Sequence, residues 1–66
     1  MQEQNIQWIK ACINSCTNIE QLKTCEILIA LFKFRLLKDG IKEEEAYRIE
    51  SDILETYVNK EANLLI

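Results

Sequence analysis

The chain has 66 residues, 48% of them hydrophobic, and its eleven acidic and eight basic side chains give a net charge of −3. A chain of this length forms one domain, residues 1–66, with a core so small that stability is marginal without a disulfide, a metal or a second subunit. The hydrophobic content excludes a disordered chain, and the negative charge makes nucleic acid an unfavourable partner. With no proline and one glycine, the composition favours helices over a turn-rich β fold.

The N-terminal residues MQEQNIQW contain neither a basic segment nor an apolar core, so we expect no signal peptide. No apolar segment approaches the roughly 20 residues that a membrane-spanning helix needs. We therefore expect no membrane association and a cytoplasmic location, where thiols stay reduced.

The first predicted helix covers residues 4–16. Its apolar side chains recur every three or four residues and form one stripe, which consists of Ile6, Ile9, Cys12, Ile13 and Cys16. A helix of about 12 residues is marginal in water alone, so this one must pack on the rest of the chain. Trp8 lies at the edge of the stripe, where it either covers the core or anchors a partner, since tryptophan is enriched at interface hot spots.

The second predicted helix covers residues 18–38. Thr17 and Glu20 have the spacing of a capping box, in which each side chain accepts a hydrogen bond from the backbone N–H of the other residue. They mark the start of this helix. Asp39 and Gly40 mark its end, because glycine readily adopts the left-handed conformation that terminates helices.

This second helix carries two apolar stripes. The first consists of Leu22, Cys25, Leu28, Ile29, Phe32 and Leu36. The second, about 170° round the helix, consists of Ile27, Ala30, Leu31, Phe34 and Leu37. Either the other two helices flank this one from different sides, or the second stripe packs on a partner. Two neighbours in a compact three-helix unit lie well under 170° apart, which favours a partner.

The third predicted helix covers residues 43–61 and begins with Glu43–Glu45, at the end where the helix dipole favours anions. Its apolar arc consists of Ala46, Ile49, Ile53 and Tyr57, widened by Tyr47, Leu54 and Val58. The short connection from the second helix makes the two an antiparallel hairpin. The apolar C-terminal residues either continue the helix or fold back on the core. We expect an all-α domain with a short first helix packed on a long antiparallel hairpin, assembling into an oligomeric helical bundle.

Catalytic and cofactor-binding patterns are absent from the sequence. There is no histidine, the commonest general acid–base residue and metal ligand, and a single glycine cannot build a phosphate-binding loop. We therefore predict no enzymatic activity, no catalytic residue and no cofactor.

Three cysteines, Cys12, Cys16 and Cys25, fall on the apolar stripes of the first two helices. Buried cysteines pack as small hydrophobic residues, and we expect that role here, with a disulfide under oxidising conditions as an alternative. Three thiolates could also hold zinc, but a structural zinc site needs a fourth ligand, and none is evident. We predict no metal site.

The predicted partner interface combines the second stripe of the second helix with the flank of the third. Its residues are Ile27, Leu31, Phe34, Leu37, Leu54, Val58 and Trp8. Glu50 falls within the apolar arc of the third helix, where a carboxylate is costly unless paired. Arg35 is its predicted partner, across the hairpin or across a dimer interface; the alternative is a glutamate at the rim that reaches water.

Trp8-Ile9-Lys10-x-Cys12-Ile13-Asn14-Ser15-Cys16, followed by Glu20-Gln21-Leu22-x-x-Cys25, resembles short helical proteins of bacteriophages and of mobile elements in AT-rich bacteria. The resemblance covers about the first half of the chain and includes no catalytic motif. It implies a virion accessory protein or an inhibitor that binds a host protein, such as a defence enzyme.

We predict a non-enzymatic protein–protein interaction module that forms a homodimer through its second apolar stripe. A first alternative is a phage-type inhibitor of a larger protein, whose acidic residues Glu43–Glu45, Glu50, Asp52 and Glu55 mimic nucleic acid. A second is a nucleic-acid-binding hairpin dimer that uses Lys33, Arg35 and Lys38, although the net charge counts against it.

Overall fold

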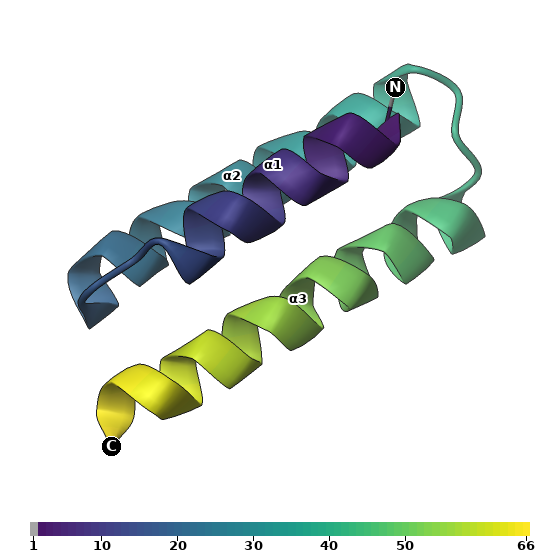
Figure 1. Ribbon diagram of the computed structural model, residues 1–66. Coiled ribbons are helices and arrows are strands. Elements are labelled where there is room, and N and C mark those ends of the chain that lie inside the picture. Colours follow the sequence, from purple (N-terminus) through teal and green to yellow (C-terminus); the bar gives the residue numbers. More distant parts are fainter. Residues whose placement is uncertain (1) are drawn as a thin grey trace.

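A computed structural model describes residues 2–66, with side chains from residue 4 onward, and shows three helices (Figure 1). They are α1 (Gln2–Asn14), α2 (Ile19–Lys38) and α3 (Glu43–Leu65). The helices α2 and α3 run antiparallel as a hairpin, and α1 lies beside them, antiparallel to α2 (Figure 1). The described chain is elongated, 39 × 17 × 16 Å. The predicted all-α architecture is confirmed.

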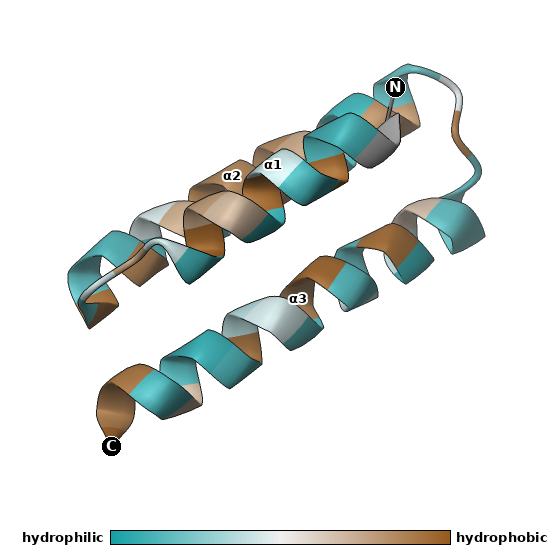
Figure 2. Cartoon of the chain, in the orientation of Figure 1, coloured by the Kyte–Doolittle hydropathy of each residue, from teal (hydrophilic) through white to brown (hydrophobic). Residues whose placement is uncertain are grey.

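The core lies between the three helices, and each contributes one apolar stripe to it. Ile13 of α1, Leu22 of α2 and Ile53 of α3 have no exposed surface. The first stripe of α2 is confirmed as the buried one, since four of its members are buried and Leu28 and Phe32 are half-buried. Figure 2 shows the contrast between the largely apolar middle of α2 and the alternating polar and apolar bands of α3.

The α1–α2 connection differs from the prediction by one residue. Asn18, not Thr17, is the N-cap of α2, and its Oδ1 accepts a hydrogen bond from the backbone N–H of Gln21 at 2.9 Å. The Gln21 side chain accepts from the backbone N–H and the hydroxyl of Thr17 in return. Glu20 therefore does not complete a box with Thr17. The capping bonds instead involve Asn18 and Gln21, because asparagine is a stronger N-cap than threonine.

The first helix spans residues 2–14 rather than the predicted 4–16. The backbone N–H of Cys16 bonds to the carbonyl of Ile13, three residues back, and the Ser15 hydroxyl donates to the Cys12 carbonyl. These bonds tighten the last turn and satisfy carbonyls that the end of a helix leaves free. Cys16 can then leave the helix and still bury its side chain.

The α2–α3 connection is short because the end of α2 satisfies its own backbone groups. Gly40 has φ +92°, and its N–H bonds to the Leu37 carbonyl, while the N–H of Ile41 bonds to the Leu36 carbonyl. This pair of bonds is a Schellman motif, and the left-handed conformation predicted for Gly40 is confirmed. Lys42 is the N-cap of α3 and forms no side-chain capping bond.

The third helix continues to Leu65, four residues beyond the predicted end. Leu64 packs against the core cluster, and this contact gives the last turn an apolar anchor. The C-terminal residues therefore continue the helix and do not fold back.

Replacing Gly40 with alanine should lower the free energy of unfolding by about 1 kcal/mol, the cost of a left-handed conformation for a residue with a Cβ. A Cβ at this position would meet no atom within 4 Å, so the cost is purely conformational. Gly40→Asn should lose less, because asparagine tolerates this conformation. Urea unfolding followed by circular dichroism measures both. Equal stability of all three proteins would contradict this account.

Candidate association surface

The second stripe of α2 is exposed. Phe34 is 72% exposed, Ile27 61% and Leu31 60%, and these three side chains form a ridge along the outer side of the helix. Three large apolar side chains of one helix in water are unusual for a chain with so small a core, because exposed apolar patches in monomers are generally limited in size. The structure thus leaves Ile27, Leu31 and Phe34 of the second stripe mostly exposed, whereas Leu37 is half-buried.

Three consecutive residues of α2 show how the ridge is oriented. Phe32 lines a groove with residues of α1, and Lys33 reaches α3. Phe34 lies about 100° further round the helix than Lys33, on the side away from α1. Three consecutive residues of α3 are arranged in the same way. Asp52 faces α1 and pairs with Lys10, Ile53 is buried, and Leu54 is exposed on the side away from α1.

Both helices of the hairpin therefore present apolar side chains on the side opposite α1. We name this surface the hairpin face; it consists of Ile27, Ala30, Phe34 and Leu37 of α2 with Tyr47, Leu54 and Val58 of α3. Val58 is 57% exposed and Leu54 38%, whereas Leu37 is half-buried. Five of the seven predicted interface residues belong to this face.

A groove of about 320 Å³ lies in the hairpin face, between the C-terminal half of α2 and the start of α3. Phe34 and Leu37 line one side and Tyr47 the other, with Ala30, Lys33 and Glu50 completing the lining. The groove adjoins the projecting ring of Phe34. The hairpin face thus holds a protruding aromatic side chain and a hollow beside it.

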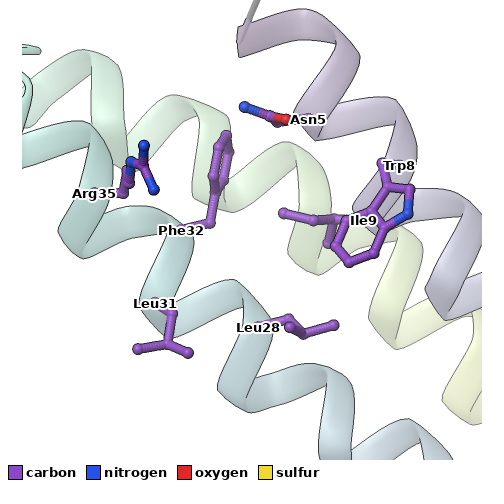
Figure 3. Close-up of a pocket in the computed structure, with 7 residues that line it drawn as sticks. All are labelled: Asn5, Trp8, Ile9, Leu28, Leu31, Phe32 and Arg35. Atoms are coloured by element: carbon purple, nitrogen blue, oxygen red, sulfur yellow. The ribbon is translucent and has the colours of Figure 1, made fainter.

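The other two predicted interface residues, Trp8 and Leu31, line a second groove of about 360 Å³, between α1 and α2 (Figure 3). The Trp8 ring stands beside Ile9, across from Leu28, while Leu31 points away from Trp8 along the rim (Figure 3). Trp8 is 59% exposed, so it covers the core only in part. Trp8 therefore lies outside the hairpin face, in the groove on the α1 side of α2.

The intrachain partner of Glu50 is Lys33, not Arg35 as predicted. The Lys33 ammonium lies 3.3 Å from the Glu50 carboxylate and 3.9 Å from the centre of the Tyr47 ring. Arg35 is two residues further along α2, about 200° round the helix, and is near Asp39 at 4.0 Å. Desolvation lowers the pKa of Lys33, but the hydrogen bond and charge of Glu50, together with the neighbouring Tyr47, outweigh it and raise the pKa.

Four of the charged residues proposed for the alternative functions have defined neighbours in the structure. Glu50 faces α2 and is paired with Lys33, whereas Asp52 faces α1 and is paired with Lys10 at 2.7 Å. These two carboxylates therefore lie on different sides of α3, whereas Glu43–Glu45 and Glu55 are exposed to water. Lys33 is likewise engaged on the α3 side of α2, while Arg35 borders the α1–α2 groove, so these two cations lie on different sides of α2.

The three thiols are free, and two of them meet in the core. The Sγ atoms of Cys16 and Cys25 are 3.6 Å apart and buried, and the Cys16 thiol also lies 3.3 Å from the Cys12 carbonyl oxygen. Burial, the contact with Cys16 and the nearby Cys12 raise the pKa of Cys25 to about 11. Within residues 2–66, no group of three histidine, cysteine or acidic side chains is arranged to hold a metal ion.

A part-buried hydrogen bond joins α2 to α3. The Tyr57 hydroxyl donates a hydrogen bond of 2.6 Å to the Glu26 carboxylate. Burial of the ring, together with this bond and the charge of Glu26, raises the pKa of Tyr57. The contact fixes the register of α2 against α3 beneath the hairpin face.

Sequence reasoning missed Lys33 and Tyr47 as residues of this surface. A signal for Lys33 was present, because it follows Ile29 by four residues and precedes Leu36 by three, and both of these are buried. That spacing puts its stem on the core side of α2. Tyr47 was recognised only as the edge of an apolar arc, because its contact with Lys33 depends on the alignment of two helices.

Stability should fall as the pH rises from 9 towards 11. The Cys25 pKa is 9.0 when the thiol is in water and about 11 in the fold. Below pH 9 the thiol is neutral in both the folded and the unfolded chain, so the stability of the fold has its full value there. Above that the unfolded thiol ionises while the folded one stays neutral, which favours unfolding by roughly 1 to 3 kcal/mol. Tyr57 adds to the loss above its ordinary pKa of 10.0. Urea unfolding under reducing conditions, at a series of pH values, measures this. Cys25→Ala should show a shallower decline, and an unchanged pH dependence would contradict the assignment.

Within the part of the chain that the structure describes, no helix combines the length and apolar character needed to cross a bilayer. Comparisons of the chain with models of protein families, with curated proteins and with solved structures find no match. The resemblance to phage and mobile-element proteins therefore stays a prediction.

Proposed function

We propose that this protein is a non-enzymatic interaction module that self-associates through the hairpin face. The observation that carries the proposal is the exposure of Phe34, Ile27 and Val58 on one side of a hairpin whose other side is already covered by α1. Association removes these side chains from water, and this is the dominant favourable contribution to most protein–protein interfaces.

Burial of the hairpin face can supply the free energy that association needs. A stable interface buries about 800 Å² on each partner, which is about a sixth of the 4959 Å² surface of this chain. Full burial of a large apolar side chain contributes roughly 1.5 to 3 kcal/mol before the costs of association. Several such side chains on one face can therefore offset those costs.

The expected assembly is a two-fold dimer. Two hairpins that meet through these faces give a four-helix core with one α1 on each outer side. In a two-fold interface the same patch serves both subunits, so a protruding residue and the hollow that receives it must lie on one surface. The hairpin face satisfies this requirement, since Phe34 projects beside the groove lined by Leu37 and Tyr47.

A glutamate at position 34 should convert the dimer into a folded monomer, because a charge in the centre of an apolar interface is desolvated without a partner. Sedimentation equilibrium under reducing conditions measures the mass of wild type and Phe34→Glu. Gln7→Glu is the matched control, since it adds the same charge to an exposed position on α1, away from the hairpin face. Circular dichroism checks that all three remain helical. A wild-type chain that stays monomeric at high concentration would overturn the proposal.

A second pair of variants distinguishes the hairpin face from the α1–α2 groove. Val58→Glu should weaken the dimer at least tenfold, because Val58 lies on the hairpin face, whereas Trp8→Ala should change the dissociation constant little. Sedimentation equilibrium over a range of concentrations measures both dissociation constants. The opposite result, with loss of the dimer in Trp8→Ala alone, would place the contact in the α1–α2 groove.

A further inference from the structure

Two thiols that the proposed association does not use lie side by side in the core. Cys16 belongs to the connection between α1 and α2, and Cys25 lies in the second turn of α2. Their Sγ atoms are 3.6 Å apart, both side chains are buried, and neither sulfur is bonded to another. A contact between two free thiols is the arrangement from which a disulfide forms with little movement.

We infer that Cys16 and Cys25 are a site of reversible oxidation, at which a low-molecular-weight disulfide such as oxidised glutathione closes an intrachain bond. Bonded sulfurs are about 2.05 Å apart, so the two Sγ atoms must approach each other by roughly 1.5 Å. Cys16 can supply this movement because it lies outside both helices, with a backbone N–H bond only to the Ile13 carbonyl. Rotation about its side-chain bonds leaves α2 in place.

The reaction takes place as two thiol–disulfide exchanges. The Cys16 thiol loses its proton, and the thiolate attacks one sulfur of oxidised glutathione, which forms a mixed disulfide and releases one glutathione thiolate. The Cys25 thiol then gives up its proton and attacks the Cys16 sulfur, which breaks the mixed disulfide and releases the second glutathione thiolate; the two glutathione thiolates take up the two protons that the cysteines lose. The protein loses two hydrogens, and one molecule of oxidised glutathione becomes two of reduced glutathione, so the electrons balance.

Cys12 is the competing partner, and the geometry disfavours it. It lies one turn before Cys16, but the Cys16 sulfur contacts the backbone carbonyl of Cys12 and the side-chain sulfur of Cys25. A disulfide between Cys12 and Cys16 would need the last turn of α1 to rearrange, whereas the bond between Cys16 and Cys25 does not.

A disulfide between Cys16 and Cys25 would restrain the connection between α1 and α2 and the start of α2. It closes the segment from residue 16 to residue 25, which contains the Asn18 cap and the first turn of α2. Cross-linking a segment of this length lowers the entropy of the unfolded chain. Oxidation should therefore raise the melting temperature by at least several degrees, and it should do so in the monomer as well as in a dimer.

Tryptic digestion followed by mass spectrometry identifies which cysteines are joined. Cleavage after Lys10, Lys23 and Lys33 leaves Cys12 and Cys16 on one peptide, residues 11–23, and Cys25 on the next, residues 24–33. After equilibration of the folded protein with oxidised glutathione and trapping of free thiols, mass spectrometry should find these two peptides joined in Cys12→Ser. The intact protein should be lighter by two hydrogens and should run as a monomer on a non-reducing gel.

Cys16→Ser is the matched control, since it keeps two cysteines but removes the sulfur that contacts Cys25. It should form no intrachain disulfide under the same conditions, and its melting temperature should not respond to the oxidant. Glutathione attached to both cysteines of Cys12→Ser, two thiols that stay free, or a disulfide within residues 11–23 of wild type would each overturn the inference. These outcomes are independent of the sedimentation results, so failure here leaves the proposed association standing.

Discussion

The burial of Ile13, Leu22 and Ile53 in one small core is the contact on which the rest of the structure depends. One residue comes from each helix, and none has any exposed surface. Isolated helices of 13 to 23 residues have little stability in water, so tertiary packing makes them persist. Because α2 contributes only its first stripe to this core, its second stripe must face outward, and the candidate association surface is a direct consequence.

Much of the fold was predictable because helical spacing is a local property. The stripe that contains Leu22 and Ile29 follows from intervals of three and four residues, and Gly40 terminates α2 through its own backbone freedom. The ends of helices were less predictable. Thr17 and Asn18 are both good caps, and the choice between them depends on which neighbour, Glu20 or Gln21, completes the bonding.

The candidate site was predictable on α2 and less so between the helices. The exposure of Phe34 and Ile27 follows from the presence of two stripes on one helix, since a small core can cover only one of them. The pairing of Glu50 depends on how α2 and α3 are rotated and aligned, which the sequence pattern of either helix alone does not contain. A helical wheel of α2 alone therefore cannot show whether Lys33 or Arg35 pairs with Glu50 of α3.

The Lys33–Glu50 pair gives the hairpin face a selectivity that its apolar residues lack. Both charged groups line the groove beside Phe34, and each keeps about a fifth to a quarter of its side-chain surface in water. A protein that covered the groove with methyl groups alone would strip the pair of that remaining hydration and lose much of the affinity that it gained. In the proposed dimer, the Phe34 ring that enters this groove must therefore pack on Leu37 and Tyr47 and leave the Lys33–Glu50 pair in contact with water or with a polar group.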